Sequence, residues 1–200
     1  MIKCAIFGDS VLRGLYREPD GHRKLWDQKY WINKIMEDCG VMVTNHSQIG
    51  NTVERGRMQF EKALNNGMKA DYVLLEYGGN DSDFEWAQVV EAPDAAHVSH
   101  TPLPVFEQAY GQFIRRVREL EMEPVAVIPA PIDGRRYLDF LGSAYDKQTI
   151  ADWLQDTTAM YRHVELYAFT VVKLAMQYGC AVLGIPNSSQ KFSTTSPARE

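Results

Sequence analysis

Three short polar stretches of this chain contain residue types that acyl transfer requires. Each follows a short apolar run: residues 8–10 (Gly-Asp-Ser), residues 44–50, which end at Gly50, and residues 78–81 (Gly-Gly-Asn-Asp). The Ser10 hydroxyl can serve as a nucleophile, and the Asn80 amide or the N–H group of Gly50 can stabilise the oxyanion that forms. Each stretch taken singly is also typical of a turn or a helix cap, so the chemistry depends on whether the fold brings the three together.

The elements that must position these residues alternate along the chain. Apolar runs typical of buried parallel strands alternate with stretches of helical periodicity, such as residues 106–120, where apolar side chains recur every three or four positions. Right-handed crossovers between such strands place helices on both faces of one sheet. The sequence therefore predicts an α/β fold, a three-layer α/β/α sandwich with a five-stranded parallel sheet, its strands at residues 2–7, 41–43, 72–77, 124–128 and 180–185.

In a parallel sheet the carboxyl ends of all strands meet at one edge, where open α/β folds build their sites. The loops after the first three expected strands contain Ser10, Gly50 and Asn80 respectively. We therefore expect these three residues to lie near one another at this edge. Of the intervening segments, residues 13–24 are expected to form a loop and residues 150–174 a single long helix.

The same residues resemble a known family. Residues 8–10, Gly50 and residues 78–81 are similar in order and spacing to the first three sequence blocks of the SGNH hydrolases, also called the GDSL esterase/lipase family. The resemblance extends over roughly residues 1–185. It implies a flavodoxin-like SGNH hydrolase fold and hydrolysis of carboxylic esters, such as short-chain acyl or acetyl esters on sugars or lipids, through an acyl-serine intermediate. It implies no metal and no organic cofactor.

The resemblance also implies a role for each of the three residues. Ser10 would be the nucleophile, and its own N–H group would be one oxyanion donor. Gly50 would supply a second donor from its backbone, and Asn80 a third from its side chain.

One block of the family pattern is different in this chain. Family members have an Asp-x-x-His motif after the fifth strand, in which the histidine is the general base and the aspartate orients it. Here residues 186–189 read Pro-Asn-Ser-Ser, and no aspartate or histidine follows His163. Either the sequence is shortened relative to the natural protein, or the chain is a variant without this base. Any single histidine is more often structural than catalytic, so the base remains unassigned among His22, His46, His97, His100 and His163.

The composition is that of an ordinary globular protein, with 200 residues of which 45% are hydrophobic and 24% charged. A formal net charge of −5 gives no reason to expect a nucleic-acid partner. No apolar run approaches the roughly 20 residues of a membrane span, and the N-terminus shows no signal-peptide pattern. Cys4, Cys39 and Cys180 are expected to be free thiols in a reducing compartment. We therefore expect one cytoplasmic domain over residues 1–200.

The sequence leaves three functions open. The first is a serine esterase acting on a small-molecule ester. The second is a catalytically impaired SGNH-like module that binds an ester or a carbohydrate, which the absent histidine favours. The third is a flavodoxin-like binder of small molecules, with an anion held by backbone N–H groups. The acyl chain and the leaving group remain open, as does the oligomeric state, for which a homo-oligomer is one alternative; residues 82–104 are expected to shape specificity.

Overall fold

Five parallel strands form one sheet. The computed structural model describes residues 1–18 and 22–184, and the strand order is β4-β1-β5-β6-β7. A two-stranded antiparallel hairpin, β2 (Leu15–Arg17) with β3 (Arg23–Leu25), lies outside the sheet. The predicted α/β fold with a five-stranded parallel sheet is confirmed, with strands β1 (Ile2–Phe7), β4 (Val41–Asn45), β5 (Tyr72–Glu76), β6 (Glu123–Ile128) and β7 (Ala181–Gly184).

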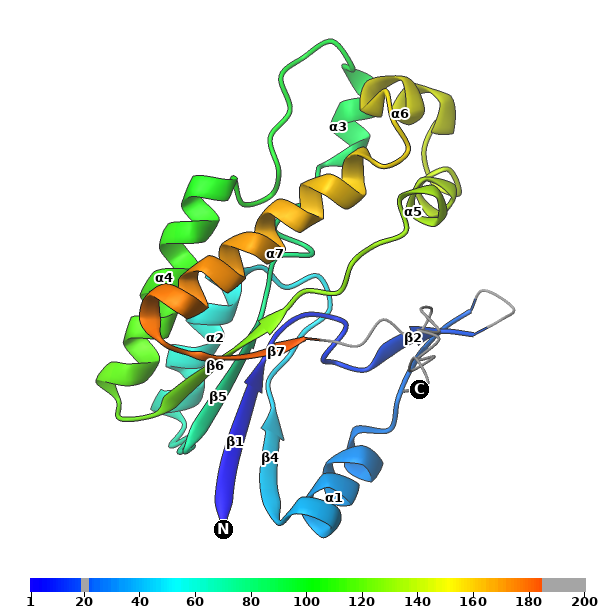
Figure 1. Cartoon of the computed structure of the whole chain (residues 1–200). Helices are drawn as coiled ribbons and strands as arrows, with labels where there is room; N and C mark the ends of the chain where they lie inside the picture. The colour runs from blue at the N-terminus through cyan, green and yellow to red at the C-terminus, as the bar shows by residue number, and fades with distance from the viewer. Residues whose placement is uncertain (19–21, 185–200) are drawn as a thin grey trace, which may run out of the picture.

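The strand order determines which face each helix covers. The chain moves from β1 to β4 in one direction and from β4 through β5 and β6 to β7 in the other. Right-handed crossovers therefore place α1 on one face and α2, α4 and α7 on the opposite face, and Figure 1 shows α4 and α7 packed together along the sheet. The helices are α1 (Gln28–Cys39), α2 (Val53–Asn65), α3 (Trp86–Glu91), α4 (Leu103–Glu119), α5 (Gly134–Leu141), α6 (Lys147–Leu154) and α7 (Ala159–Tyr178).

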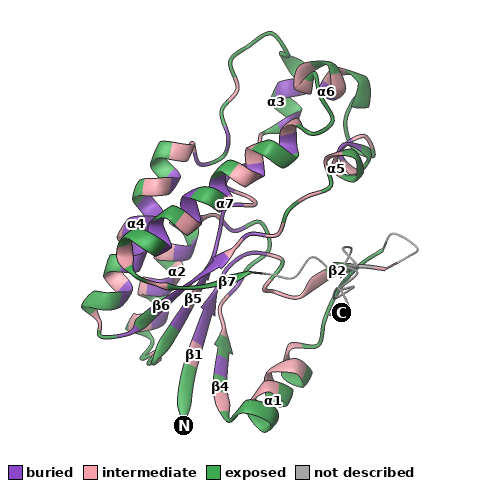
Figure 2. Ribbon diagram, viewed as in Figure 1, coloured by how far each residue is buried: buried purple, intermediate pink, exposed green. Residues whose placement is uncertain are grey.

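The main hydrophobic core lies between the sheet and α2, α4 and α7 (Figure 2). Phe7 at the end of β1 packs edge-on against Phe60 of α2, with 5.3 Å between ring centroids. Phe113 of α4 contacts both rings. Such edge-on aromatic pairs add to the stabilisation from burial alone, so this cluster holds the carboxyl end of β1 firmly, three residues before Ser10.

A second apolar cluster lies beyond the carboxyl ends of the strands. In Figure 1, α3, α5, α6 and the first turns of α7 project together from that end of the sheet. Their buried side chains include Trp86, Leu138, Ile150 and Met160, one from each of these helices. The segments that follow β5 and β6 therefore share a small core of their own.

Some local features differ from the sequence expectations. Residues 13–24 contain the β2–β3 hairpin rather than only a loop. The helical periodicity of residues 150–174 is divided between α6 and α7, because Gln155 adopts a left-handed backbone conformation with φ of 60° and ends α6. Of the residues that the structure describes, no helix is both long and apolar enough to cross a membrane.

Candidate active site

Ser10 lies in a tight turn directly after β1. Gly8 and Asp9 are buried, whereas Ser10 is half-buried. The turn is closed by two backbone hydrogen bonds, from the N–H of Arg13 to the Asp9 carbonyl (3.0 Å) and from the N–H of Leu15 to the Ser10 carbonyl (2.9 Å). The Ser10 hydroxyl itself makes no hydrogen bond to any described residue. It is therefore available to a substrate.

The loop that contains Gly50 is attached to the same turn. The Gly8 carbonyl accepts from the backbone N–H of Gln48 (3.1 Å) and from Nδ2 of Asn51 (3.3 Å). Gly50 is exposed, with φ of 70°, a conformation that glycine adopts with little strain. Its carbonyl is turned toward Arg55, and its N–H group has no partner among the described residues. The Gly50 N–H is thus a free donor.

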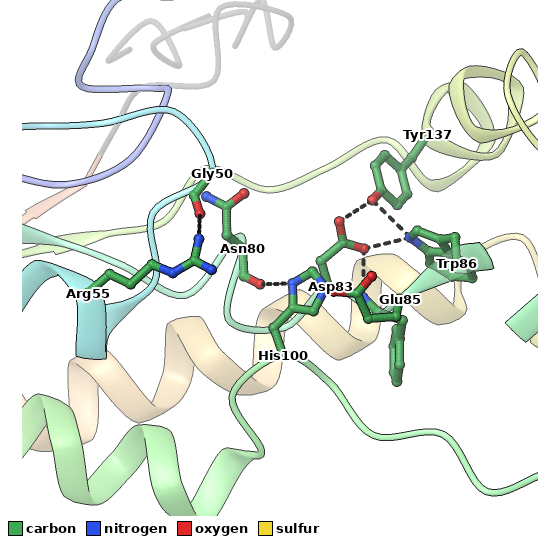
Figure 3. A network of polar contacts seen from close by, with 9 residues as sticks. Gly50, Arg55, Asn80, Asp83, Glu85, Trp86, His100 and Tyr137 are labelled. Atoms are coloured by element: carbon green, nitrogen blue, oxygen red, sulfur yellow. Dashed lines mark hydrogen bonds and ion pairs between the residues drawn. The ribbon is translucent and has the colours of Figure 1, made fainter. Parts of the chain in front are cut away.

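Asn80 lies in the loop after β5 and approaches the loops of Ser10 and Gly50. In Figure 3 its side chain points toward Gly50. Its Nδ2 donates to Oδ2 of Asp9 at 2.7 Å, which uses one of the two amide hydrogens and leaves the other. The structure thus brings the loops of Ser10, Gly50 and Asn80 to one edge of the sheet, as expected from the sequence.

Asp81 fixes the loop that carries Asn80. Its carboxylate accepts from the backbone N–H groups of Gly78 (3.0 Å) and Val53 (3.0 Å), the first residue of α2. Burial raises the pKa of Asp81 to about 6, and these hydrogen bonds oppose that rise. Gly78 has φ of 132°, so this tight loop requires glycine there. One buried carboxylate therefore connects the end of β5 to the start of α2.

Two residues near the site were missed by the sequence reasoning, Asp9 and Glu76. Asp9 is the middle residue of the Gly-Asp-Ser stretch, yet its carboxylate binds Asn80 and the N–H of Val11 (2.8 Å). Glu76 is fully buried at the end of β5 and accepts from the Asp9 N–H (3.2 Å). A single charged residue within the apolar run 72–77 was the signal that could have identified Glu76, because buried charges need partners.

Two half-buried histidines lie in aromatic surroundings. His46 stacks on Phe7 with 4.7 Å between ring centroids, and His163 stacks on Phe84 at 5.2 Å. Burial lowers the pKa of both, and Nε2 of each has no hydrogen-bond partner. No hydrogen bond joins either of them to Ser10 within the described part of the chain.

The remaining histidines are engaged elsewhere or exposed. His100 is fixed between two oxygen atoms, with Nδ1 3.0 Å from the Asn80 carbonyl and Nε2 3.2 Å from Oε1 of Glu85 (Figure 3). His97 contacts the carbonyl of Ala92 through Nε2 (2.8 Å), and His22 is exposed. Within the described part of the chain, no histidine hydrogen-bonds Ser10. Residues 186–189, where the family motif would fall, lie outside the described residues.

Open space borders the site on the side of β4. A groove of about 1020 Å³ runs between β4 and α2, and Arg13, Gln48 and Ile49 line the end nearest Gly50. The groove therefore ends beside the loop that carries Gly50.

Comparison with known proteins identifies the family. The family model described as GDSL-like Lipase/Acylhydrolase matches residues 5–180, and no curated protein sequence matches. Among solved structures, a lipase/acylhydrolase from Enterococcus faecalis is 17% identical with a TM-score of 0.60, over 91% of this chain and 75% of that one.

Two further structures are similar to the same extent. An alpha/beta hydrolase enzyme from the metagenome of Lake Arreo is 20% identical with a TM-score of 0.59, over 90% of this chain and 75% of the other. A catalytic mutant of an acetylxylan esterase from Geobacillus stearothermophilus is 20% identical with a TM-score of 0.59, over 90% and 74%. At these identities the structures establish the fold, and the family model establishes the membership. The chain belongs to the GDSL-like lipase/acylhydrolase family, also called the SGNH hydrolases, a family of carboxylic ester hydrolases.

Proposed function

We propose that this protein is a serine esterase that cleaves short-chain acyl or acetyl esters through an acyl-Ser10 intermediate. The observation that carries this proposal is that hydrogen bonds hold the loops of Ser10, Gly50 and Asn80 together at one edge of the sheet: Gln48 and Asn51 donate to the Gly8 carbonyl, and Asn80 donates to Asp9. Acyl transfer needs this combination of nucleophile and preorganised donors.

The chemistry follows from these positions. The Ser10 oxygen attacks the ester carbonyl carbon while its proton passes to a base, and the carbonyl oxygen becomes an oxyanion. The N–H groups of Ser10 and Gly50 and the amide of Asn80 stabilise that charge. The tetrahedral intermediate then collapses, the alcohol leaves with a proton, and water hydrolyses the acyl-serine to release the acid and restore the hydroxyl.

A general base must take the proton of the Ser10 hydroxyl. Catalytic mutants of the similar acetylxylan esterase replace a serine, an aspartate or a histidine by alanine, which agrees with the triad implied by the family. We propose that His46, His97, His100 and His163 do not replace that base without rearrangement, since their contacts lie away from Ser10. General-base catalysis contributes about 10² to 10⁴-fold, so an esterase that lacks such a base is slow.

The test is hydrolysis of 4-nitrophenyl acetate by the 200-residue chain beside its Ser10→Ala variant. Ser143→Ala is the matched control, because Ser143 is exposed and bonds only to the Phe140 carbonyl. Activity that is lost in Ser10→Ala and kept in Ser143→Ala supports the proposal. Equal activity in all three proteins would contradict it.

One observation favours a second function. The Ser10 hydroxyl has no basic partner among the described residues, which fits an SGNH-like module that binds an ester or carbohydrate without cleaving it. A fluorophosphonate probe distinguishes the two, because it labels an activated serine and leaves an inert one unmodified. Labelling at Ser10 supports the esterase, and binding of an acetylated oligosaccharide without labelling supports the module.

A further inference from the structure

Glu76 is a carboxyl group buried where the rest of the strand is apolar. It ends β5, is 1% exposed, and has no ion pair with a basic residue in the described part of the chain. An isolated carboxylate in such a place is very unfavourable unless it is neutralised or paired. The group that meets it is another acid, Asp9, which is 4% exposed.

Glu76 and Asp9 lie against each other. Oε2 of Glu76 accepts from the Asp9 N–H at 3.2 Å, and the two carboxyl groups lie within hydrogen-bonding range of each other. A hydrogen bond between two carboxyl groups requires a proton on one of them. Since Asp9 already accepts from Val11 and Asn80, the proton belongs on Glu76, which then donates to Asp9.

The surroundings favour this arrangement. Burial raises the pKa of both groups, and the charge of Asp9 raises that of Glu76 further, well above its usual range. The other titratable groups that interact electrostatically with Glu76 are the Asp81 carboxylate and the hydroxyls of Tyr77 and Tyr110. None of these brings a positive charge, so a second negative charge on Glu76 has no compensation.

Two glycines provide the space for the pair. A Cβ atom on Gly8 would lie 3.0 Å from Oε2 of Glu76, and one on Gly79 would lie 3.3 Å from Oδ2 of Asp9. Both distances are shorter than ordinary van der Waals contact, so larger residues would push the carboxyl groups away. The glycines on either side of the site thus allow the backbone to approach the acids closely.

We propose that Glu76 is a positioning residue for ester hydrolysis: as a neutral acid it holds the Asp9 carboxylate, and Asp9 in turn holds the amide of Asn80 in the oxyanion site. This inference rests on the proposed function, because it gives Glu76 a role in that same site. The inference adds a fourth residue to Ser10, Gly50 and Asn80. Unlike those three, Glu76 does not touch the substrate.

The arrangement has a consequence at alkaline pH. When the shared proton leaves to solvent, two carboxylates remain in contact and repel each other. Asp9 must then move, and the Asn80 amide that it binds moves with it. A displacement of about 1 Å in an active site can lower a rate by about 10²-fold, so kcat should fall at high pH while KM changes little.

Two substitutions separate positioning from simple burial. Glu76→Gln has the shape of the neutral acid: its amide nitrogen can donate to Asp9 and its oxygen can accept from the Asp9 N–H. We expect a kcat within about twofold of the original protein at neutral pH and no alkaline decrease that depends on this group. Glu76→Ala removes both hydrogen bonds, and we expect kcat to fall about 10- to 100-fold. Glu61→Gln is the matched control, an exposed glutamate paired with Arg116, and should leave the pH profile unchanged.

The proton can also be observed without turnover. The carbonyl stretching band of a neutral carboxylic acid should be present in the infrared spectrum at about pH 8 and absent in Glu76→Gln. Absence of this band in the original protein, or an unchanged alkaline decrease in Glu76→Gln, would overturn the inference while leaving the proposed function intact. A band without any esterase activity would refute the proposed function and the positioning role together.

Discussion

The Nδ2 atom of Asn80 lies 2.7 Å from Oδ2 of Asp9, a contact that joins loops 71 residues apart in sequence. Asp9 precedes the proposed nucleophile, and Asn80 is the proposed oxyanion donor. The hydrogen bond therefore sets the distance between the two parts of the site. An amide held in this way needs little reorganisation when charge develops, which is the condition for strong electrostatic stabilisation.

The first prediction concerns Asn80 itself. In Asn80→Ala we expect kcat for 4-nitrophenyl acetate to fall about 10² to 10³-fold with KM nearly unchanged, because an oxyanion donor acts mainly on the transition state. Asn65→Ala is the control, since Asn65 is exposed near the end of α2. An Asn80→Ala variant with unchanged kcat would contradict the assignment of this side chain as a donor.

The second prediction uses two glycines with the same backbone conformation. Gly50 and Gly40 have φ of 70° and 67°, and a Cβ on either would meet nothing within 4 Å. Replacement by alanine should therefore destabilise the fold by a similar amount in each case, about 1 kcal/mol from left-handed backbone strain. Only Gly50→Ala should also lower kcat, by about 10-fold or more, because strain at that position turns the N–H away from the oxyanion.

Urea denaturation and ester hydrolysis on both variants would check this prediction. Gly40 ends α1 and precedes the amino end of β4, at the edge of the sheet opposite the site, so its variant reports the stability effect alone. Equal losses of activity in the two variants would show that Gly50 acts through stability and not through its N–H group.

Much of this architecture could be predicted from the sequence, because apolar runs ending in Gly-Asp-Ser and Gly-Gly-Asn-Asp identify buried parallel strands and their loops. The β2–β3 hairpin could not be predicted, since its strands have only three residues each. Such short strands have too few positions to show an alternation of apolar and polar side chains. The division between α6 and α7 depends on the left-handed conformation of Gln155. Glutamine rarely adopts that conformation, so the sequence does not predict a helix end there. The contacts of His100 depend on how residues 82–104 fold, and local periodicity does not describe that segment.

The contact between Asp9 and Glu76 could not be predicted from the sequence, for a different reason. Both residues were visible in the sequence, but their contact requires the register of β1 against β5, in which Phe7 lies opposite Leu75. Sequence reasoning placed the loops correctly and still missed the buried acids, because it searched for reacting groups and not for the groups that hold them.

The third prediction compares two buried tyrosines. The Tyr77 hydroxyl has no hydrogen-bond partner, whereas that of Tyr110 donates to the Leu75 carbonyl at 2.8 Å. Removing an unpaired buried hydroxyl relieves a desolvation penalty, so Tyr77→Phe should raise the free energy of unfolding by about 1 kcal/mol. Tyr110→Phe removes this hydrogen bond and should lower the free energy of unfolding by about 1 kcal/mol. Urea unfolding of the two variants measures both changes, and a loss of stability in Tyr77→Phe would show that its hydroxyl has a partner after all.

The fourth prediction concerns stability against pH. Burial and the neighbouring Asp9 raise the pKa of Glu76 in the folded protein. The folded state therefore keeps a proton that the unfolded chain releases above about pH 4.3. Stability from this group is then fully present below that pH and is lost as pH rises toward the folded-state pKa.

Glu76→Gln cannot titrate at this position, so its free energy of unfolding should decrease less between about pH 5 and about pH 8 than that of the original protein. Asp81, whose pKa is raised to about 6 by burial, contributes a decrease of the same sign in both proteins, and the difference between the two profiles isolates Glu76. Parallel profiles would mean that Glu76 is ionised in the folded state at neutral pH. A steeper decrease in the original protein would place the extra proton of the folded state on Glu76, where its burial against Asp9 favours the neutral acid.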